Sequence, residues 1–395
     1  MNEGIKLFLK VAYYTTIFSC FFFLFYNHVY NYQPIVRYEN DLYLHLEKEF
    51  GNERNNLSRT SYNHPGFHII VIFFSLLTTI SIPNAAIIIL SLCVASTAFF
   101  IKKIVDFYLL QKYSDVWRYT ITTCLMLISS IYVPMFNSFL YLGQGSSAVY
   151  HNPTLIALKP FLFATLFLLM KAWSTARTSP WIYWTVSVLL AYGSLIKPNF
   201  VLIFIPSILF LYCLGLAFRR AFIDMSVKNM LILVGPTLCA LSFQYVVEYF
   251  FGSNHDSIVL DWFRLWQSWS PNILFSLLLA LLFPLSVILL RWRSFFCSPM
   301  FVLAAIMMCV GIMQFGLLGE VKKHGAGNWG WSYVTALHII FVYATIEFFR
   351  WIPSLKLNAS WADKASVAVI SMTFCLHMAS GIFYFFKVMS GLNYG

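Results

Sequence analysis

Long apolar segments repeat along almost the whole of this 395-residue chain and leave little room for any other kind of structure. A helix needs about 17–25 apolar residues to cross the ~30 Å of hydrocarbon in a bilayer. Eleven segments approach or reach that length: residues 7–26, 85–101, 119–136, 154–172, 181–196, 200–218, 230–250, 272–290, 300–318, 332–349 and 365–384. Charged residues make up only 10% of the chain, far below the ~25% that is usual in soluble domains. We therefore expect an all-α polytopic membrane protein that forms one transmembrane domain over residues 1–395.

A twelfth apolar stretch, residues 66–80, decides the orientation of the chain. It is short for a crossing and runs directly toward Pro83. Short cytoplasmic loops carry an excess of Lys and Arg. If residues 66–80 do not cross, sixteen of the 26 basic residues lie on one side, which is then cytoplasmic: Lys6, Lys10, Lys102, Lys103, Lys112, Arg118, Lys171, Arg177, Arg219, Arg220, Lys228, Arg291, Arg293, Arg350, Lys356 and Lys364. This count predicts a cytoplasmic N-terminus, an outer C-terminus, and an outer segment 27–84 with an amphipathic helix and an interfacial or re-entrant helix.

The loops predicted on the cytoplasmic side are short and, apart from their basic residues, contain no candidate catalytic residues. The net charge of +11 therefore follows from topology and from attraction to anionic lipid, so we infer membrane lipids as partners and no nucleic acid. Seven of the eight cysteines lie inside apolar segments, which argues against a disulfide framework or a zinc cluster. No cofactor is predicted, although the sequence leaves a divalent metal open.

The first outer loop carries an acidic stripe. Asp41, His45 and Glu49 recur every four residues, and so do apolar residues between them, which predicts an amphipathic helix on the membrane surface. Asp41 stands at its start, where the helix dipole favours an ionised carboxylate by ~0.3–1 kcal/mol. Asp41 is therefore a candidate catalytic base, with Glu39 as the second choice. The alternative is that Asp41 is only a helix cap and the stripe a solvated face.

Neutral polar residues gather in the outer loop 137–153. Gln144, His151 and Asn152 offer hydrogen-bond donors and acceptors that suit sugar hydroxyls, and the glycines of this loop allow a close approach of the backbone. His64, at the end of the first outer loop, is a further candidate for binding a sugar or an acceptor. A plain polar turn capped by Asn152 is the alternative for loop 137–153.

Cations at the outer boundary predict a phosphate site. Lys197 lies between two spans, and Lys322, Lys323 and His324 lie in a loop, residues 319–331, where two lysines oppose the positive-inside bias. These four residues are the predicted ligands of a donor phosphate. The same loop supplies further candidates for binding a sugar or an acceptor: Glu320, Asn328 and Trp329. The alternatives are anchoring to lipid head groups for the lysines and interfacial anchoring for Trp329 and the nearby Trp331.

The order of these features resembles the GT-C superfamily of membrane glycosyltransferases. A first span is followed by an outer loop with the acidic pair Glu39 and Asp41, then by His64-Pro65 at the entry to an interfacial helix, and then by a bundle of short-looped spans. The resemblance covers roughly residues 1–200. It implies a GT-C-like bundle of about eleven transmembrane helices, a polyprenyl-phosphate-linked sugar donor, a glycan or lipid-linked acceptor, and catalysis by Asp41 at the outer face.

The same resemblance implies the assembly of cell-envelope polysaccharide at a bacterial cytoplasmic (inner) membrane, with the active site facing the periplasm or the cell exterior. The chain departs from the metal-using oligosaccharyl transferases, because Gly143-Gln144-Gly145 stands where a second Asp-x-Asp motif is expected. No metal ligand is therefore assigned.

Two other functions are left open by the sequence. A polymerase or ligase of O-antigen-type polysaccharide assembly would use the same lipid carriers, but with a larger outer loop and a site dominated by arginine. A transporter or flippase of lipid-linked sugars would place polar and charged residues at mid-membrane, often in broken helices. The predicted spans contain few such residues, His377 being an exception, and this favours an enzyme.

Overall fold

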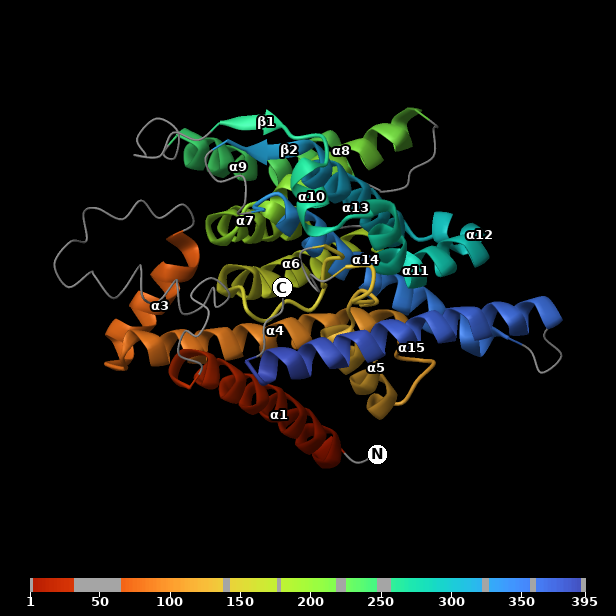
Figure 1. Ribbon diagram of the computed structural model, residues 1–395, viewed down its shortest axis with the longest axis horizontal. Coiled ribbons are helices and arrows are strands. Elements are labelled where there is room, and N and C mark those ends of the chain that lie inside the picture. Colours follow the sequence, from red (N-terminus) through yellow and green to blue (C-terminus); the bar gives the residue numbers. More distant parts are fainter. Residues whose placement is uncertain are drawn as a thin grey trace.

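Helices account for nearly all regular structure in this protein. The computed structural model describes residues 3–31, 65–137, 143–175, 179–217, 225–246, 257–321, 327–355 and 360–391. The elements in chain order are α1 (Glu3–Tyr30), α3 (Pro65–Thr78), α4 (Ile82–Leu109), α5 (Asp115–Leu127), α6 (Pro153–Trp173), α7 (Pro180–Ile196), α8 (Asn199–Ala217), α9 (Val227–Val246), β1 (Ile258–Leu260), α10 (Arg264–Trp269), α11 (Ile273–Leu290), α12 (Trp292–Phe296), α13 (Pro299–Leu317), β2 (Leu318–Glu320), α14 (Gly330–Trp351), a 3-10 helix (Ile352–Ser354) and α15 (Trp361–Met389). Strands β1 and β2 pair antiparallel as a small ribbon at the edge of the helical bundle (Figure 1).

Among the described residues, nine helices are long and apolar enough to cross a membrane: α1, α4, α6, α8, α9, α11, α13, α14 and α15. Two apolar helices are shorter, α7 with 17 residues and α3 with 14. The prediction of an all-α membrane protein is confirmed. Ten of the eleven predicted segments lie mainly within one helix each, whereas segment 119–136 does not.

The helix predicted over residues 119–136 is wrong beyond Leu127. Helix α5 ends there after 13 residues, and residues 128–137 continue as irregular chain. Irregular backbone is tolerated at membrane depth only where the protein pairs its polar groups. The Ile131 N–H donates to the Leu279 carbonyl of α11 at 3.2 Å, and the Ser380 hydroxyl of α15 donates to the backbone of this segment at 2.6 Å. Residues 128–130 are therefore buried inside the bundle, whereas residues 134–136 are exposed.

His377 of α15 holds the irregular chain from the other side. Its Nδ1 donates to the Ser129 carbonyl at 2.7 Å, and its Nε2 accepts the backbone N–H of Phe283 at 3.3 Å. A neutral imidazole makes both contacts when its proton is on Nδ1. Helix α15 comes this close because Gly381 has no side chain, since a Cβ there would lie 1.9 Å from the Leu127 carbonyl oxygen. His377 thus has a structural role in the interior.

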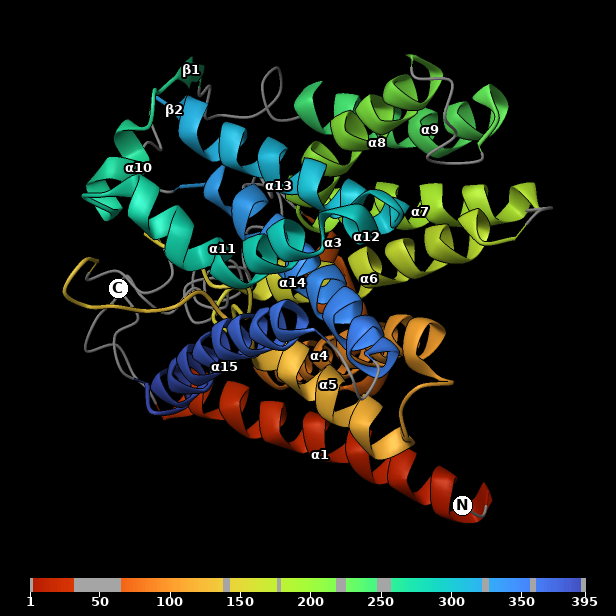
Figure 2. The same cartoon turned by 90° about the vertical axis from the view of Figure 1, so that its right-hand side faces the viewer.

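Helix α14 occupies the centre of the bundle (Figures 1 and 2). It packs against α13, α11, α8 and α4, and 94% of the residues in its most apolar stretch are buried. The corresponding stretches of α1 and α15 are only 11% and 22% buried. Most side chains of these outer helices are at least partly exposed, as expected of helices that face lipid.

Helix α3 is short and packs against α4 and α7. Its 14 residues span about 21 Å, which is less than the ~30 Å of hydrocarbon in a bilayer. The start of α3 lies against the end of α7, where a Cβ on Gly66 would meet Ile196 at 2.8 Å and where the Tyr192 hydroxyl donates to the Gly66 carbonyl at 3.2 Å. Because Lys197 follows directly, α3 is fixed beside a predicted site residue.

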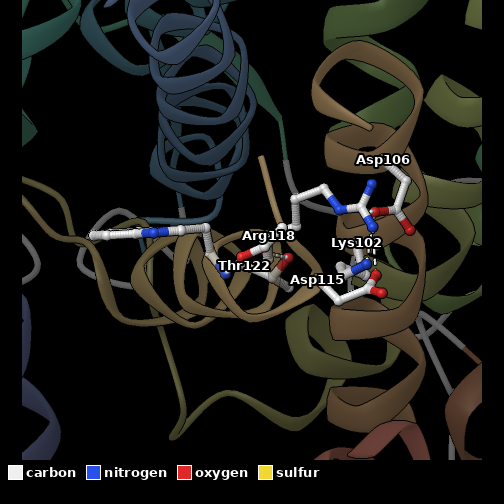
Figure 3. A network of polar contacts seen from close by, with 7 residues as sticks. Lys102, Asp106, Asp115, Arg118 and Thr122 are labelled. Atoms are coloured by element: carbon white, nitrogen blue, oxygen red, sulfur yellow. Dashed lines mark hydrogen bonds and ion pairs between the residues drawn. The ribbon is translucent and has the colours of Figure 1, made fainter. Parts of the chain in front are cut away.

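An ion-pair network joins α4 to α5 (Figure 3). Asp106 Oδ1 lies 2.6 Å from Lys102 Nζ and 3.1 Å from Arg118 Nε, and Arg118 also pairs with Asp115. The side chains of both cations are almost fully buried, whereas both carboxylates are 28% exposed. In both overall views, this junction lies at the end of the bundle away from β1 and β2. The network fixes the start of α5 and with it the irregular chain that follows.

Candidate functional site

Loop 143–152 runs inside the bundle, although the sequence predicted a loop at the outer surface. Every one of its residues is buried. The Tyr333 hydroxyl of α14 donates to the Gln144 carbonyl at 2.7 Å. Lys159 Nζ of α6 donates to the Ser147 carbonyl at 3.1 Å. The expectation of a surface loop is wrong because backbone groups of the loop form hydrogen bonds with the surrounding helices. These bonds offset the free-energy cost of burying backbone polar groups.

Lys197 is the residue around which several predicted binding residues meet. It follows α7 in extended conformation, and only 6% of its surface is exposed. Its Nζ donates to Asn152 Oδ1 and to Thr154 Oγ1, both at 3.2 Å, and lies 4.6 Å from the centre of the Trp331 ring. Asn152 also caps α6, because its Oδ1 accepts the Leu155 N–H at 2.9 Å. Two neutral oxygens and an indole face are thus among the contacts of this buried ammonium.

Two further sets of contacts connect this group to α8, α14 and α15. At the start of α8, Asn199 Nδ2 donates to the Asn328 carbonyl at 2.9 Å and to Ser332 Oγ at 3.1 Å. His151 Nδ1 lies 3.0 Å from the Tyr384 hydroxyl of α15. The side chains of this site therefore come from segments far apart in the sequence, and helix packing brings them together.

An aromatic hollow adjoins Lys197 and shares Trp331 with it. The hollow is shallow and is lined by Trp269, Phe315, Gly327, Gly330, Trp331, Tyr333 and Val334. Gly327 is required here, because its φ is +63° and a Cβ would lie 2.1 Å from the Trp269 ring. No charged side chain is among the described residues that line it. The hollow therefore presents an apolar and mainly aromatic lining.

Two ionisable side chains near the site, those of Glu320 and Tyr150, lie in different surroundings. Glu320 of β2 accepts a hydrogen bond from Asn328 Nδ2 at 2.7 Å, so a carboxylate lies beside the exposed residue Asn328, which precedes α14. Burial raises the pKa of the Tyr150 phenol above its usual range. Tyr150 is therefore a neutral donor, and its hydroxyl donates to the Met126 carbonyl.

The predicted site residues differ in where they lie in the structure. The structure brings together Lys197, His151, Asn152 and Asn328, and it joins Glu320 to Asn328. Trp329 is half-buried beside Asn328, and Gln144 is fully buried. The side-chain amide of Gln144 has no hydrogen-bond partner among the described residues. Six predicted residues lie outside the described residues: Glu39, Asp41, His64, Lys322, Lys323 and His324.

Sequence reasoning missed four residues of this group. Thr154 and Asn199 each stand two positions after a predicted site residue, so their spacing could have revealed them. The position of Trp331 in the sequence indicated only an interfacial anchor. Tyr384 lies within an apolar segment and offered no signal, since its contact with His151 spans 233 positions of the chain.

Within the described part of the chain, no three His, Cys, Asp or Glu side chains form a group that could hold a metal ion. No protein-family model matches the chain, and no curated protein or solved structure matches it either. The sequence pattern and the geometry around Lys197 are therefore the basis for a functional assignment.

Proposed function

We propose that this protein is a membrane glycosyltransferase with a GT-C-like bundle, which transfers a sugar from a polyprenyl-phosphate donor to a glycan or lipid-linked acceptor. We further propose that it lies in a bacterial cytoplasmic membrane with a cytoplasmic N-terminus and an outward-facing site. The observation that carries the proposal is Lys197, a buried cation that contacts neutral oxygens and Trp331 beside an aromatic hollow. A departing phosphate requires a positioned cation, and a sugar requires polar partners at an enclosed surface.

In the proposed reaction, the bond between the anomeric carbon and the donor phosphate oxygen breaks, and a bond from that carbon to the acceptor oxygen forms. Lys197 stabilises the charge that develops on the phosphate, and the basic residues of loop 319–331 assist it. Asn152 and its neighbours orient sugar hydroxyls. Asp41, with Glu39 as the second choice, accepts the proton from the acceptor hydroxyl.

The test compares Lys197→Gln with Lys228→Gln, a matched change of an exposed lysine at the start of α9. Each purified protein is given a panel of polyprenyl-phosphate hexoses and pentoses with lipid-linked acceptors. One charge-assisted contact is worth ~1.5–3 kcal/mol, so Lys197→Gln should lower kcat/KM for the accepted donor by about tenfold or more. The Lys228 variant should match the wild type. Equal activity of the two variants would remove Lys197 from the phosphate site, and absence of turnover with every donor would reject the glycosyltransferase.

A transporter or flippase of lipid-linked sugars is the second candidate. The irregular chain 128–137 favours it, because transporters carry discontinuous helices near the middle of the bilayer. The interior also holds more polar groups than the sequence suggested, among them Lys159 and His338, whose Nε2 donates to the Leu125 carbonyl at 3.0 Å. In proteoliposomes without acceptor, a flippase moves a fluorescent polyprenyl-phosphate sugar between leaflets. A glycosyltransferase leaves that distribution unchanged and forms a product when acceptor is added.

A further inference from the structure

Two arginines stand where the apolar helix α11 meets the short helix α12. Arg291 follows the last residue of α11, and Arg293 is the second residue of α12. Helix α12 connects α11 to α13, and both of these neighbours are long and apolar enough to cross a membrane. Helix α12, which Figure 1 shows at the right-hand end of the bundle, therefore lies at a membrane boundary together with both arginines.

Indole rings hold both guanidinium groups at this junction. The guanidinium carbon of Arg291 lies 4.5 Å from the centre of the Trp351 ring, at the end of α14. The guanidinium carbon of Arg293 lies 5.3 Å from the centre of the Trp292 ring. A guanidinium over an indole face makes this contact with its π surface and not with its N–H groups. The N–H donors of both arginines therefore still need acceptors.

Neither arginine has a carboxylate partner within the described part of the chain. The ion pairs found there include neither Arg291 nor Arg293, and the buried Nε of Arg291 has no hydrogen-bond partner among the same residues. Glu347 contacts α12, but its Oε2 accepts a hydrogen bond from Ser294 Oγ at 3.1 Å and its Oε1 pairs with Arg350 at 2.7 Å. The two arginines therefore carry positive charge that this part of the protein leaves uncompensated.

Exposed apolar side chains flank the two arginines. Leu289 near the end of α11 is 70% exposed, and Trp292 and Phe296 of α12 are 56% and 49% exposed. Residues four apart lie on one face of a helix, so α12 turns an aromatic face outward beside its charged residues. A basic helix with an aromatic face is typical of the membrane interface. A soluble anion needs no such face, whereas a lipid has acyl chains that cover it.

We propose that the α11–α12 junction binds an anionic phospholipid. Its phosphate accepts hydrogen bonds from Arg291 and Arg293, because the planar fork of a guanidinium matches two phosphate oxygens. Its acyl chains lie against Leu289, Trp292 and Phe296. The head group carries a net negative charge, since the cation of a zwitterionic head group would face two guanidinium groups. The inference goes beyond the proposed transfer reaction and does not depend on it.

Native mass spectrometry of the full-length protein in detergent measures the affinity for single lipids. The probes are dioleoylphosphatidylglycerol and dioleoylphosphatidylcholine. We expect the wild type to bind the first phosphatidylglycerol about tenfold more tightly than phosphatidylcholine, and Arg291→Gln and Arg293→Gln each to weaken that binding about tenfold. Lys364→Gln removes an exposed charge near the start of α15 and should match the wild type. Equal affinity for phosphatidylglycerol in all four proteins would overturn the proposal.

Arg291→Lys separates a shaped phosphate site from the general attraction of basic loops to anionic lipid. Lysine keeps the charge on which that attraction depends, but its ammonium lacks the planar fork. We expect this variant to bind phosphatidylglycerol about fivefold more weakly than the wild type does, and wild-type affinity would contradict the proposed site. Excess inorganic phosphate should leave the lipid bound. Displacement of the lipid by phosphate would assign the arginines to a soluble anion instead.

Photo-crosslinking locates the bound lipid. A benzophenone amino acid replaces Phe296, and the control position is Leu274, which is 79% exposed at the other end of α11. In phosphatidylcholine nanodiscs with radiolabelled phosphatidylglycerol, labelling at position 296 should exceed that at 274 by about tenfold and lose this excess in Arg293→Gln. Arg293 is exposed, so this variant serves if Arg291→Gln does not fold. Equal labelling at both positions, or an excess that survives Arg293→Gln, would refute the proposal.

Discussion

The crossing of α15 over the end of α5 predicts that Gly381→Ala is strongly destabilising. A Cβ at position 381 would lie 1.9 Å from the Leu127 carbonyl oxygen, where real contacts stay above 3.0 Å, so α15 must move by about 1 Å. Such overpacking costs about 1–3 kcal/mol. The movement also stretches the hydrogen bonds of His377 and Ser380 with residues 129–132, each worth about 0.5–1.5 kcal/mol. With one of them lost, the free energy of unfolding should fall by about 1.5–4.5 kcal/mol.

Gly235→Ala is the matched control, because a Cβ on Gly235 in α9 would meet nothing within 4 Å. Its effect should stay below about 1 kcal/mol in either direction. Both variants and the wild type are unfolded by SDS titration from mixed micelles, with loss of tertiary contacts followed by tryptophan fluorescence. A Gly381→Ala protein as stable as the Gly235→Ala protein would refute the close approach of α15 to α5, and with it the buried position of residues 128–130.

Three other predictions concern the ion pairs, the topology and the proposed base. Asp106→Asn leaves Arg118 with fewer carboxylate partners, and because that carboxylate is partly exposed we expect a loss of about 1–3 kcal/mol in unfolding free energy, measured by the same titration. In a protein that keeps Cys297 alone of its native cysteines and carries Asn328→Cys, a membrane-impermeant thiol reagent should label position 328 in intact cells and Cys297 only after permeabilisation; labelling of both in intact cells would reject the predicted orientation. Asp41→Asn should abolish transfer and leave polyprenyl-phosphate binding intact, and wild-type turnover by this variant would pass the role of base to another carboxylate.

The sequence predicted most helices correctly and one segment wrongly, for an identifiable reason. Hydrophobicity reports whether a segment avoids water, and both a lipid-facing helix and an irregular chain buried in protein do so. Within segment 119–136, Ser129, Ser130 and Pro134 were signals against a continuous helix, since proline removes a backbone donor and clashes with the preceding turn. The prediction of a helix over residues 119–136 nevertheless followed the apolar composition of the segment.

The candidate site was predictable only in part. Lys197 could be singled out because an ammonium at the membrane boundary needs a partner. That reasoning identifies the residue itself but not the residues of other helices that contact it. Its position on the Trp331 ring depends on how α7 packs with α6 and how α8 packs with α14, which a single sequence does not encode as a local pattern. The burial of Gln144 has the same origin, since Tyr333 of α14 holds that part of the loop in the interior.

The irregular chain inside the bundle has a consequence for the order in which this protein can be made. Ser130 receives its hydrogen bond from Ser380, which is synthesised 250 residues later. At about 5–20 residues per second, a ribosome needs about 12–50 s to supply that partner. During this interval, the backbone groups of residues 129–132 that α15 later pairs would each cost several kcal/mol in lipid. The nascent segment must therefore wait in the translocation channel or at the aqueous boundary, and its burial becomes one of the last steps of biogenesis, completed only when α15 arrives.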